Sequence, residues 1–199
     1  MNIRAYLAEF LGAMTLTMAV TVSSAFNTSI SPPVIAGLTL GLFVYTVGAI
    51  SGAHLNPAVT LGMLSIEKIK PKHALGYIVF QFLGATVGML LLRGLVGDLV
   101  RMTATSSLQD GVGEAIGAFF LAFGVAAATY RKLDPAIAGI VVGSSLLLGA
   151  YIVSSAGFSK GVLNPAVSWG LGTFNVMYVL GPIVGAVVGA WAFKLLHDE

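Results

Sequence analysis

The sequence predicts an all-α membrane protein with six transmembrane helices and two re-entrant half-helices, arranged as an inverted repeat. Three observations support this. Hydrophobic residues make up 57% of the 199 residues and charged residues only 9%, whereas a soluble protein has about 25% charged residues. The apolar residues form runs long enough to cross a bilayer, and a set of short landmarks recurs in the same order in both halves.

Six apolar segments approach the roughly 20 residues that a helix needs to cross about 30 Å of hydrocarbon. These predicted spans are residues 4–26, 33–50, 72–96, 111–130, 135–154 and 178–195. Two shorter apolar segments, 56–66 and 164–174, follow the second and fifth spans. Each reaches only about 16 Å as a helix, so it is either a surface segment or a re-entrant half-helix.

An internal repeat distinguishes between these two possibilities. The matching segments are 8–13 with 113–118, 33–37 with 135–139, 55–59 with 163–167, and 84–88 with 185–189. We therefore predict one transmembrane channel domain over residues 1–199, with repeat one at 1–100 and repeat two at 101–199. Each repeat holds three spans, an odd number, so the two insert with opposite topology. The short segments then enter from opposite faces and meet near the middle of the membrane.

The distribution of basic residues predicts the orientation, because cytoplasmic loops carry an excess of Lys and Arg. With the N-terminus inside, the cytoplasmic group is Arg4, Lys68, Lys70, Lys72, Arg131, Lys132 and Lys194, and the outer group is Arg93, Arg101 and Lys160. We therefore expect a multi-pass protein of the plasma membrane with both termini in the cytoplasm.

Each short segment begins with the motif Asn-Pro-Ala. Asn is a favoured helix cap and Pro a favoured first residue, so both motifs read as helix starts. A half-helix that starts in mid-membrane directs free N–H groups and the positive end of its dipole to the centre. Water or a hydroxyl accepts hydrogen bonds there, whereas cations are repelled and a proton-conducting water chain is interrupted. The predicted pore residues are Asn56, Pro57, Ala58, Asn164, Pro165 and Ala166.

The chain resembles the aquaporin and aquaglyceroporin family, also called the major intrinsic proteins. The resemblance is carried by Ser-Gly-Ala-His-Leu-Asn-Pro-Ala-Val-Thr at 51–60, by Ala-Glu-Phe at 8–10 and by Gly-Pro at 181–182, and it covers the whole chain. It implies six tilted helices, two half-helices, one pore per subunit and a homotetramer in the lipid bilayer.

The resemblance also implies a narrow extracellular filter, and here the chain departs from the family pattern. Val167 follows the second Asn-Pro-Ala, where the family usually has Arg. Family spacing places the other filter positions at Ala36, Gly161 and Ile152, or at Tyr151 if the second loop holds one extra residue. These residues predict a wider and less polar constriction that favours solutes with apolar surface.

Lys160 lies beside the predicted filter. One interpretation is that it reaches back to the pore mouth and partly replaces the missing positive charge. The other is that it is a solvated loop residue.

Glu9 and Glu114 lie inside predicted spans, at repeat-related positions. An intramembrane carboxylate needs a partner and is a functional candidate by default. These two could form a proton relay in a coupled transporter. The interpretation that their symmetry favours is that each accepts hydrogen bonds from the backbone of a re-entrant loop.

We therefore predict a passive channel for water and small uncharged solutes, with glycerol-like polyols, urea, ammonia and hydrogen peroxide as candidates, that excludes protons and ions. The alternatives are an ion- or proton-coupled carrier and a structural membrane protein with a vestigial pore. No nucleophile–base pair stands out, so we expect no enzyme. We also expect no cofactor, no metal site and, with a net charge of +2, no nucleic-acid partner.

Overall fold

The computed structural model describes residues 3–26, 28–97 and 102–197. Within these ranges the long helices are α1 (Ile3–Ala25), α2 (Pro32–Ser51), α4 (Pro71–Val96), α5 (Leu108–Tyr130), α6 (Pro135–Ser155) and α8 (Val176–His197). The two short helices are α3 (Pro57–Ser65) and α7 (Pro165–Leu171). All six long helices are long and apolar enough to cross a membrane. This confirms the predicted fold class, whereas the predicted repeat junction at residues 100 and 101, with Arg101, lies outside the described residues.

Local sequence determines where the helices begin. Proline lacks a backbone N–H and has a fixed φ, so it is tolerated at the first helical position, where no intrahelical bond is lost. The helices that start with it are α2, α3, α4, α6 and α7. Helix α5 starts earlier than the predicted residue 111, because Ser107 and Asp110 form a reciprocal capping box at its first turn.

The end of α7 differs from the prediction. The sequence predicts helix to residue 174, but α7 ends at Leu171 because Gly172 takes a left-handed conformation with φ of 86°. Glycine adopts this conformation without a steric penalty, and its N–H donates to the carbonyl of Ser168 at 3.1 Å. Helix α8 then begins at Val176, before the predicted residue 178, since the side-chain oxygen of Asn175 accepts the N–H of Met177 at 2.9 Å.

The two halves of the chain use the same helix contact. Helix α4 packs on α1, and its counterpart α8 packs on α5. A Cβ atom at Gly84 would lie 2.2 Å from the carbonyl oxygen of Phe10, and one at Gly185 would lie 2.0 Å from that of Ala115. Small residues therefore let the backbones touch at repeat-related positions, as is typical of close helix packing in lipid.

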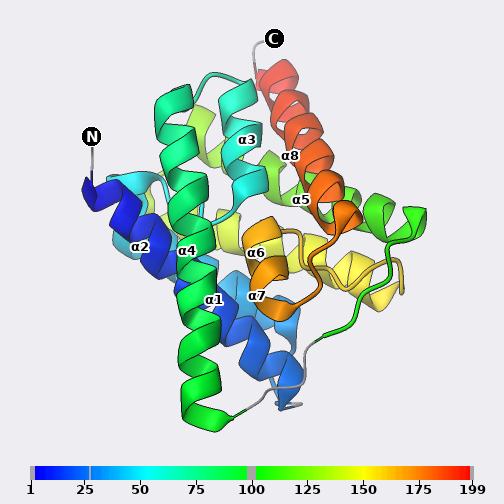
Figure 1. Cartoon of the computed structure of the whole chain (residues 1–199). Coiled ribbons are helices and arrows are strands. Elements are labelled where there is room, and N and C mark those ends of the chain that lie inside the picture. Colours follow the sequence, from blue (N-terminus) through cyan, green and yellow to red (C-terminus); the bar gives the residue numbers. More distant parts are fainter. Residues whose placement is uncertain (1–2, 27, 98–101, 198–199) are drawn as a thin grey trace.

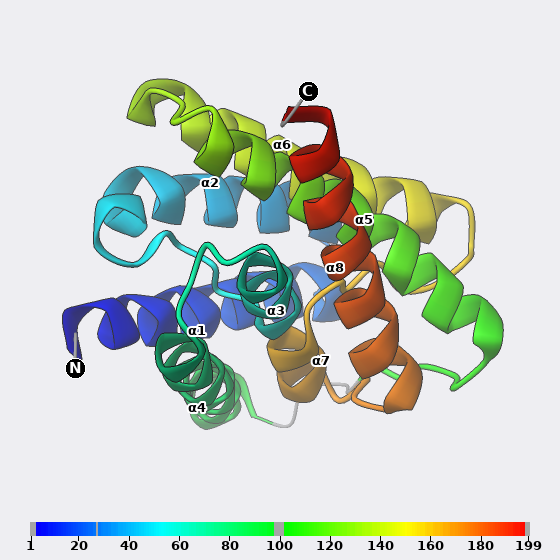
Figure 2. The same ribbon diagram turned by 90° about the horizontal axis from the view of Figure 1, so that it is seen from above.

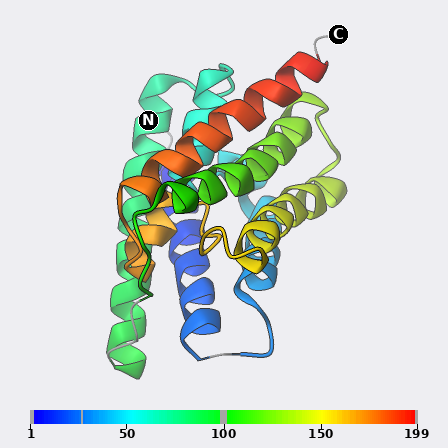
Figure 3. The ribbon, with the colours of Figure 1, turned by 90° about the vertical axis from the view of Figure 1, so that its right-hand side faces the viewer.

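The short helices occupy the interior of the bundle. Helices α3 and α7 point in opposite directions from the middle of the molecule, and α1 begins on the side where α8 ends (Figure 1). Seen from above, both short helices lie between α4 and α8 (Figure 2). Figure 3 shows α8, α5 and α6 side by side and inclined to α4. The N-terminal ends of α3 and α7 thus lie in the centre of the bundle that the long helices form.

Candidate functional site

The asparagines of the two motifs cap the half-helices. The side-chain oxygen of Asn56 accepts the N–H of Ala58 at 2.8 Å. That of Asn164 accepts the N–H groups of Ala166 at 3.0 Å and Val167 at 3.3 Å. Both asparagines are only 3% exposed. Each cap satisfies part of the unpaired backbone at a helix start and fixes the direction of the amide nitrogen.

Each asparagine also binds the loop of the opposite repeat. The amide nitrogen of Asn56 donates to the carbonyl of Leu163, and that of Asn164 donates to the carbonyl of Leu55, both at 2.9 Å. The two leucines have φ values of 52° and 56°, a left-handed conformation that costs roughly 1–3 kcal/mol in a side-chain-bearing residue. An amide carries two hydrogens, so these contacts use one hydrogen of each asparagine.

Glu9 holds the loop before the first motif. One carboxylate oxygen accepts the hydroxyl of Ser51 at 2.7 Å and the N–H of His54 at 3.0 Å. The other accepts the N–H of Leu55 at 2.6 Å and the amide nitrogen of Gln81 at 2.7 Å. Because these four donors occupy both oxygens, the contacts support the loop-holding interpretation over a proton relay.

Glu114 makes the equivalent contacts in the second repeat. One oxygen accepts the hydroxyl of Ser159 at 2.8 Å and the N–H of Val162 at 3.0 Å, and the other accepts the N–H of Leu163 at 2.5 Å. Like Glu9, it is completely buried. Sequence reasoning missed the two serines, although Ser51 and Ser159 recur at the same offset as the Asn-Pro-Ala motifs and could have been found by it.

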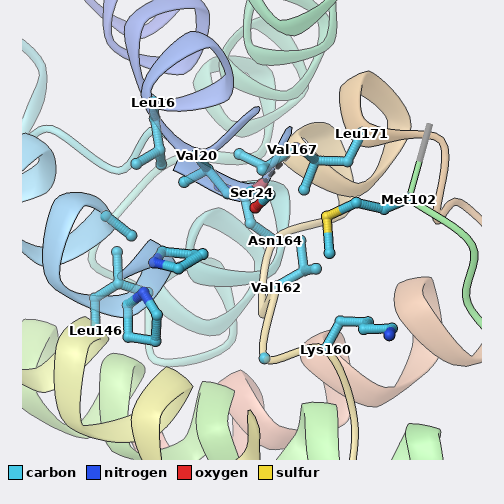
Figure 4. Close-up of a pocket in the computed structure, with 14 residues that line it drawn as sticks. Leu16, Val20, Ser24, Met102, Leu146, Lys160, Val162, Asn164, Val167 and Leu171 are labelled. Atoms are coloured by element: carbon cyan, nitrogen blue, oxygen red, sulfur yellow. Dashed lines mark hydrogen bonds between the residues drawn. The ribbon is translucent and has the colours of Figure 1, made fainter. Parts of the chain in front are cut away.

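A cavity of about 60 Å³ lies beside the second motif (Figure 4). The predicted filter residues Ala36, Gly161 and Val167 all line it, together with Asn164. Most of the wall is apolar, and further apolar lining residues are Leu16, Val20, Pro32, Pro33, Met102, Leu146, Val162 and Leu171. The side-chain hydrogen-bonding groups that the cavity offers a solute are therefore few, those of Asn164, Ser24 and Lys160.

Helix α6 contributes one described residue to the lining of the cavity. Among the described residues that line the cavity, α6 supplies Leu146, and neither Ile152 nor Tyr151 belongs to this set. Tyr151 is 56% exposed on the outside of the bundle. The loop from the end of α6 to Asn164 is longer than the equivalent loop from α2 to Asn56.

Lys160 lines two spaces. One is the cavity, and the other is a larger pocket of about 520 Å³ whose polar wall includes Thr105, Asp110 and Ser159. Its side chain is exposed, and Figure 4 shows its amine at the edge of the lining residues. Among the described residues that line the cavity, Lys160 is the only charged one.

Comparisons with known proteins agree with this geometry. The family model described as major intrinsic protein matches residues 1–193. The chain is 36% identical to aquaporin NIP1-1 of Zea mays over 98% of this chain and 75% of that protein. It is 35% identical to the probable aquaporin AqpM of Archaeoglobus fulgidus, over 81% and 74% of the respective lengths.

A solved structure shows the same fold. The X-ray structure of the aquaglyceroporin from Plasmodium falciparum matches with a TM-score of 0.78 at 23% identity, over 100% of this chain and 96% of that one. The match of the family model along nearly the whole chain, with relatives above 30% identity, leads to one conclusion. The chain belongs to the major intrinsic protein family.

Proposed function

We propose that this protein is a passive channel that conducts small uncharged solutes with some apolar surface, such as glycerol, together with water. The observation that carries the proposal is the wall beside Asn164, where Ala36, Gly161 and Val167 are small or apolar and most of the other lining residues are apolar. The relatives are named aquaporins, and their membership of a channel family supports a channel without catalytic activity.

The lining supports solutes of mixed polarity over water alone. A molecule that enters exchanges its hydration shell for the contacts the wall provides. Water can bind only the few polar groups near Asn164 and gains nothing from the valine and leucine side chains. A polyol or urea can place its polar groups on the amide and its less polar face on Val20, Leu146 and Val167. We therefore infer that the wall lowers the barrier for such solutes relative to water.

Three features support the exclusion of charge. The N-terminal ends of α3 and α7 meet at the centre, and each carries roughly half a positive elementary charge. Asn56 and Asn164 each keep one amide hydrogen for the oxygen of a passing molecule. A water molecule bound there orients the waters on its two sides in opposite directions, which interrupts proton transfer along the chain of waters. Lys160 adds a full positive charge at the rim. Cations and protons therefore meet one electrostatic barrier at the rim of the cavity and another at the centre of the molecule.

A coupled carrier is less well supported by the same geometry. Carriers bind their substrate and coupling ion near the middle of the membrane. Here the centre holds two asparagine amides and the carbonyls of Leu55 and Leu163. The nearby carboxylates, Glu9 and Glu114, are occupied by loop donors. We propose one pore per subunit of a homotetramer, as the family resemblance implies. We also propose that it lies in the plasma membrane with both termini cytoplasmic, the orientation that the distribution of basic residues predicts.

The test is stopped-flow light scattering on proteoliposomes that carry wild type, Val167→Arg or Val167→Leu. The wild type should pass glycerol and urea well above protein-free vesicles. Arginine should reduce glycerol flux about tenfold, a barrier of about 1.4 kcal/mol, while water flux persists. The Val167→Leu variant separates the effect of side-chain volume from the effect of charge, because leucine is larger than valine but uncharged. Unaltered glycerol flux in Val167→Arg would show that Val167 does not lie at the constriction.

A further inference from the structure

We propose that Tyr178 is a positioning residue that fixes the loop on the outer side of the second motif and thereby determines which solutes pass. The proposal rests on the proposed function for its second part, the choice of solute. Its first part, the fixing of the loop, stands on contacts alone and is tested separately below.

The hydroxyl of Tyr178 connects three elements. It accepts the backbone N–H of Lys160 at 2.9 Å and donates to a carboxylate oxygen of Asp110 at 3.3 Å. The tyrosine extends from the first turns of α8 and is completely buried. One hydroxyl therefore joins α8, the start of α5 and the loop between α6 and α7.

Asp110 is itself held in place, so it forms a fixed end of this connection. Its second oxygen accepts the hydroxyls of Thr105 and Ser107 and the N–H of Ser107, the last at 3.2 Å. Asp110 belongs to the capping box of α5 and is 7% exposed. Because α5 is a long packed helix, the loop is bound through Tyr178 to a rigid part of the protein.

The loop that Tyr178 holds forms the wall of the cavity. Lys160, Gly161 and Val162 are consecutive lining residues. Behind them, a Cβ atom at Gly161 would lie 2.6 Å from the carbonyl oxygen of Ala150, and φ of Gly161 is 66°. The loop thus lies tightly against α6, while Glu114 holds its inner end and Tyr178 its outer end. Loss of the outer contact would release Lys160 and alter the width and charge of the mouth.

The first repeat provides an internal comparison. Tyr77 is the counterpart of Tyr178 at the offset of 101 seen in the sequence, and its hydroxyl donates to the carbonyl of Ser51 at 2.7 Å. There the loop has an additional support, because Gln81 also binds Glu9. In the second repeat the same position is Pro182, which has no side-chain donor. The first loop, residues 52–55, is not among the described residues that line the cavity.

These differences predict unequal effects of two matched substitutions. Tyr178→Phe keeps the buried ring and removes only the hydroxyl, which leaves the Lys160 N–H without its acceptor. Tyr77→Phe makes the same chemical change in the loop that does not line the cavity. Both variants should fold, and circular dichroism in detergent checks this.

Hydrogen–deuterium exchange tests the fixing of the loop. In Tyr178→Phe, exchange of the peptide covering residues 158–163 should rise about fivefold to tenfold, the equivalent of one net hydrogen bond. In Tyr77→Phe the same peptide should exchange as in the wild type. Unchanged exchange in Tyr178→Phe would overturn the proposal, whether or not the protein conducts any solute.

Flux measurements test the choice of solute. In proteoliposomes, Tyr178→Phe should raise the permeability ratio of a four- or five-carbon polyol to water severalfold, and Tyr77→Phe should leave the ratio unchanged. Faster exchange with an unaltered ratio would contradict the role of Tyr178 in selectivity. A wild type that passes no solute would contradict the proposed function, whereas the exchange result would still decide the positioning role.

Discussion

At the scale of single residues, the two buried glutamates show how an isolated carboxylate is stabilised in a membrane bundle. Glu9 has four donors and Glu114 has three. Hydrogen bonds to a charged group contribute about 1.5–3 kcal/mol, and a buried donor left unpaired costs about 1–3 kcal/mol. These carboxylates therefore fix both re-entrant loops.

The substitution Glu114→Gln tests this account of the loops. Its amide hydrogens would face backbone donors such as the N–H of Leu163, so we expect a loss of about 2–4 kcal/mol in the free energy of unfolding. Glu67→Gln is the matched control, because Glu67 is exposed in a loop and should change stability by less than about 0.5 kcal/mol. Denaturant unfolding in detergent measures both, and equal effects would argue against the loop-holding role.

Lys160 allows a test of charge exclusion at the pore mouth. Removing its charge with Lys160→Gln should raise potassium leak a few-fold, with a larger effect at low salt, because screening acts over about 8 Å at physiological ionic strength. Arg93→Gln removes the same charge from a residue that does not line the described cavity. Leak is followed with a potassium-sensitive dye in vesicles. Equal leak in the two variants would mean that Lys160 is an ordinary solvated residue.

At the scale of elements, some boundaries could be predicted from the sequence and others could not. Proline at a first helical position is a local signal, so the starts of α3 and α7 were predicted within one residue. The end of α7 was wrong because Gly172 stops the helix before the apolar run ends. The filter position on α6, Ile152 or Tyr151, stays a prediction, since neither residue is among the described lining residues of the cavity, to which α6 supplies Leu146.

The close contact between α5 and α8 at Gly185 can be tested by substitution. Gly185→Ala places a methyl group against the Ala115 carbonyl and should lower stability by about 1–3 kcal/mol through overpacking. Gly94→Ala is the control, because no atom lies within 4 Å of a Cβ there and alanine favours helix by up to about 1 kcal/mol. Unfolding of both variants in mixed micelles measures the difference. A stabilising Gly185→Ala would contradict the close contact of α5 and α8.

At the scale of the whole molecule, the inverted repeat determines where the chemistry lies. Duplication of the motif predicted that the two turns meet in the centre. It could not predict that Asn56 binds the carbonyl of Leu163 while Asn164 binds that of Leu55. These two hydrogen bonds accompany a left-handed backbone conformation at both leucines, which leucine does not favour. Symmetry therefore predicts the site, and the tertiary structure determines which hydrogens remain for a solute.

The proposed function requires that this centre passes uncharged solutes without coupling to an ion. The most direct test is glycerol flux into wild-type proteoliposomes as a function of glycerol concentration, with and without a proton gradient. We expect a rate that increases linearly with concentration and is the same in both conditions. Flux that saturates at low concentration, or glycerol that accumulates against its gradient when protons flow, would contradict it.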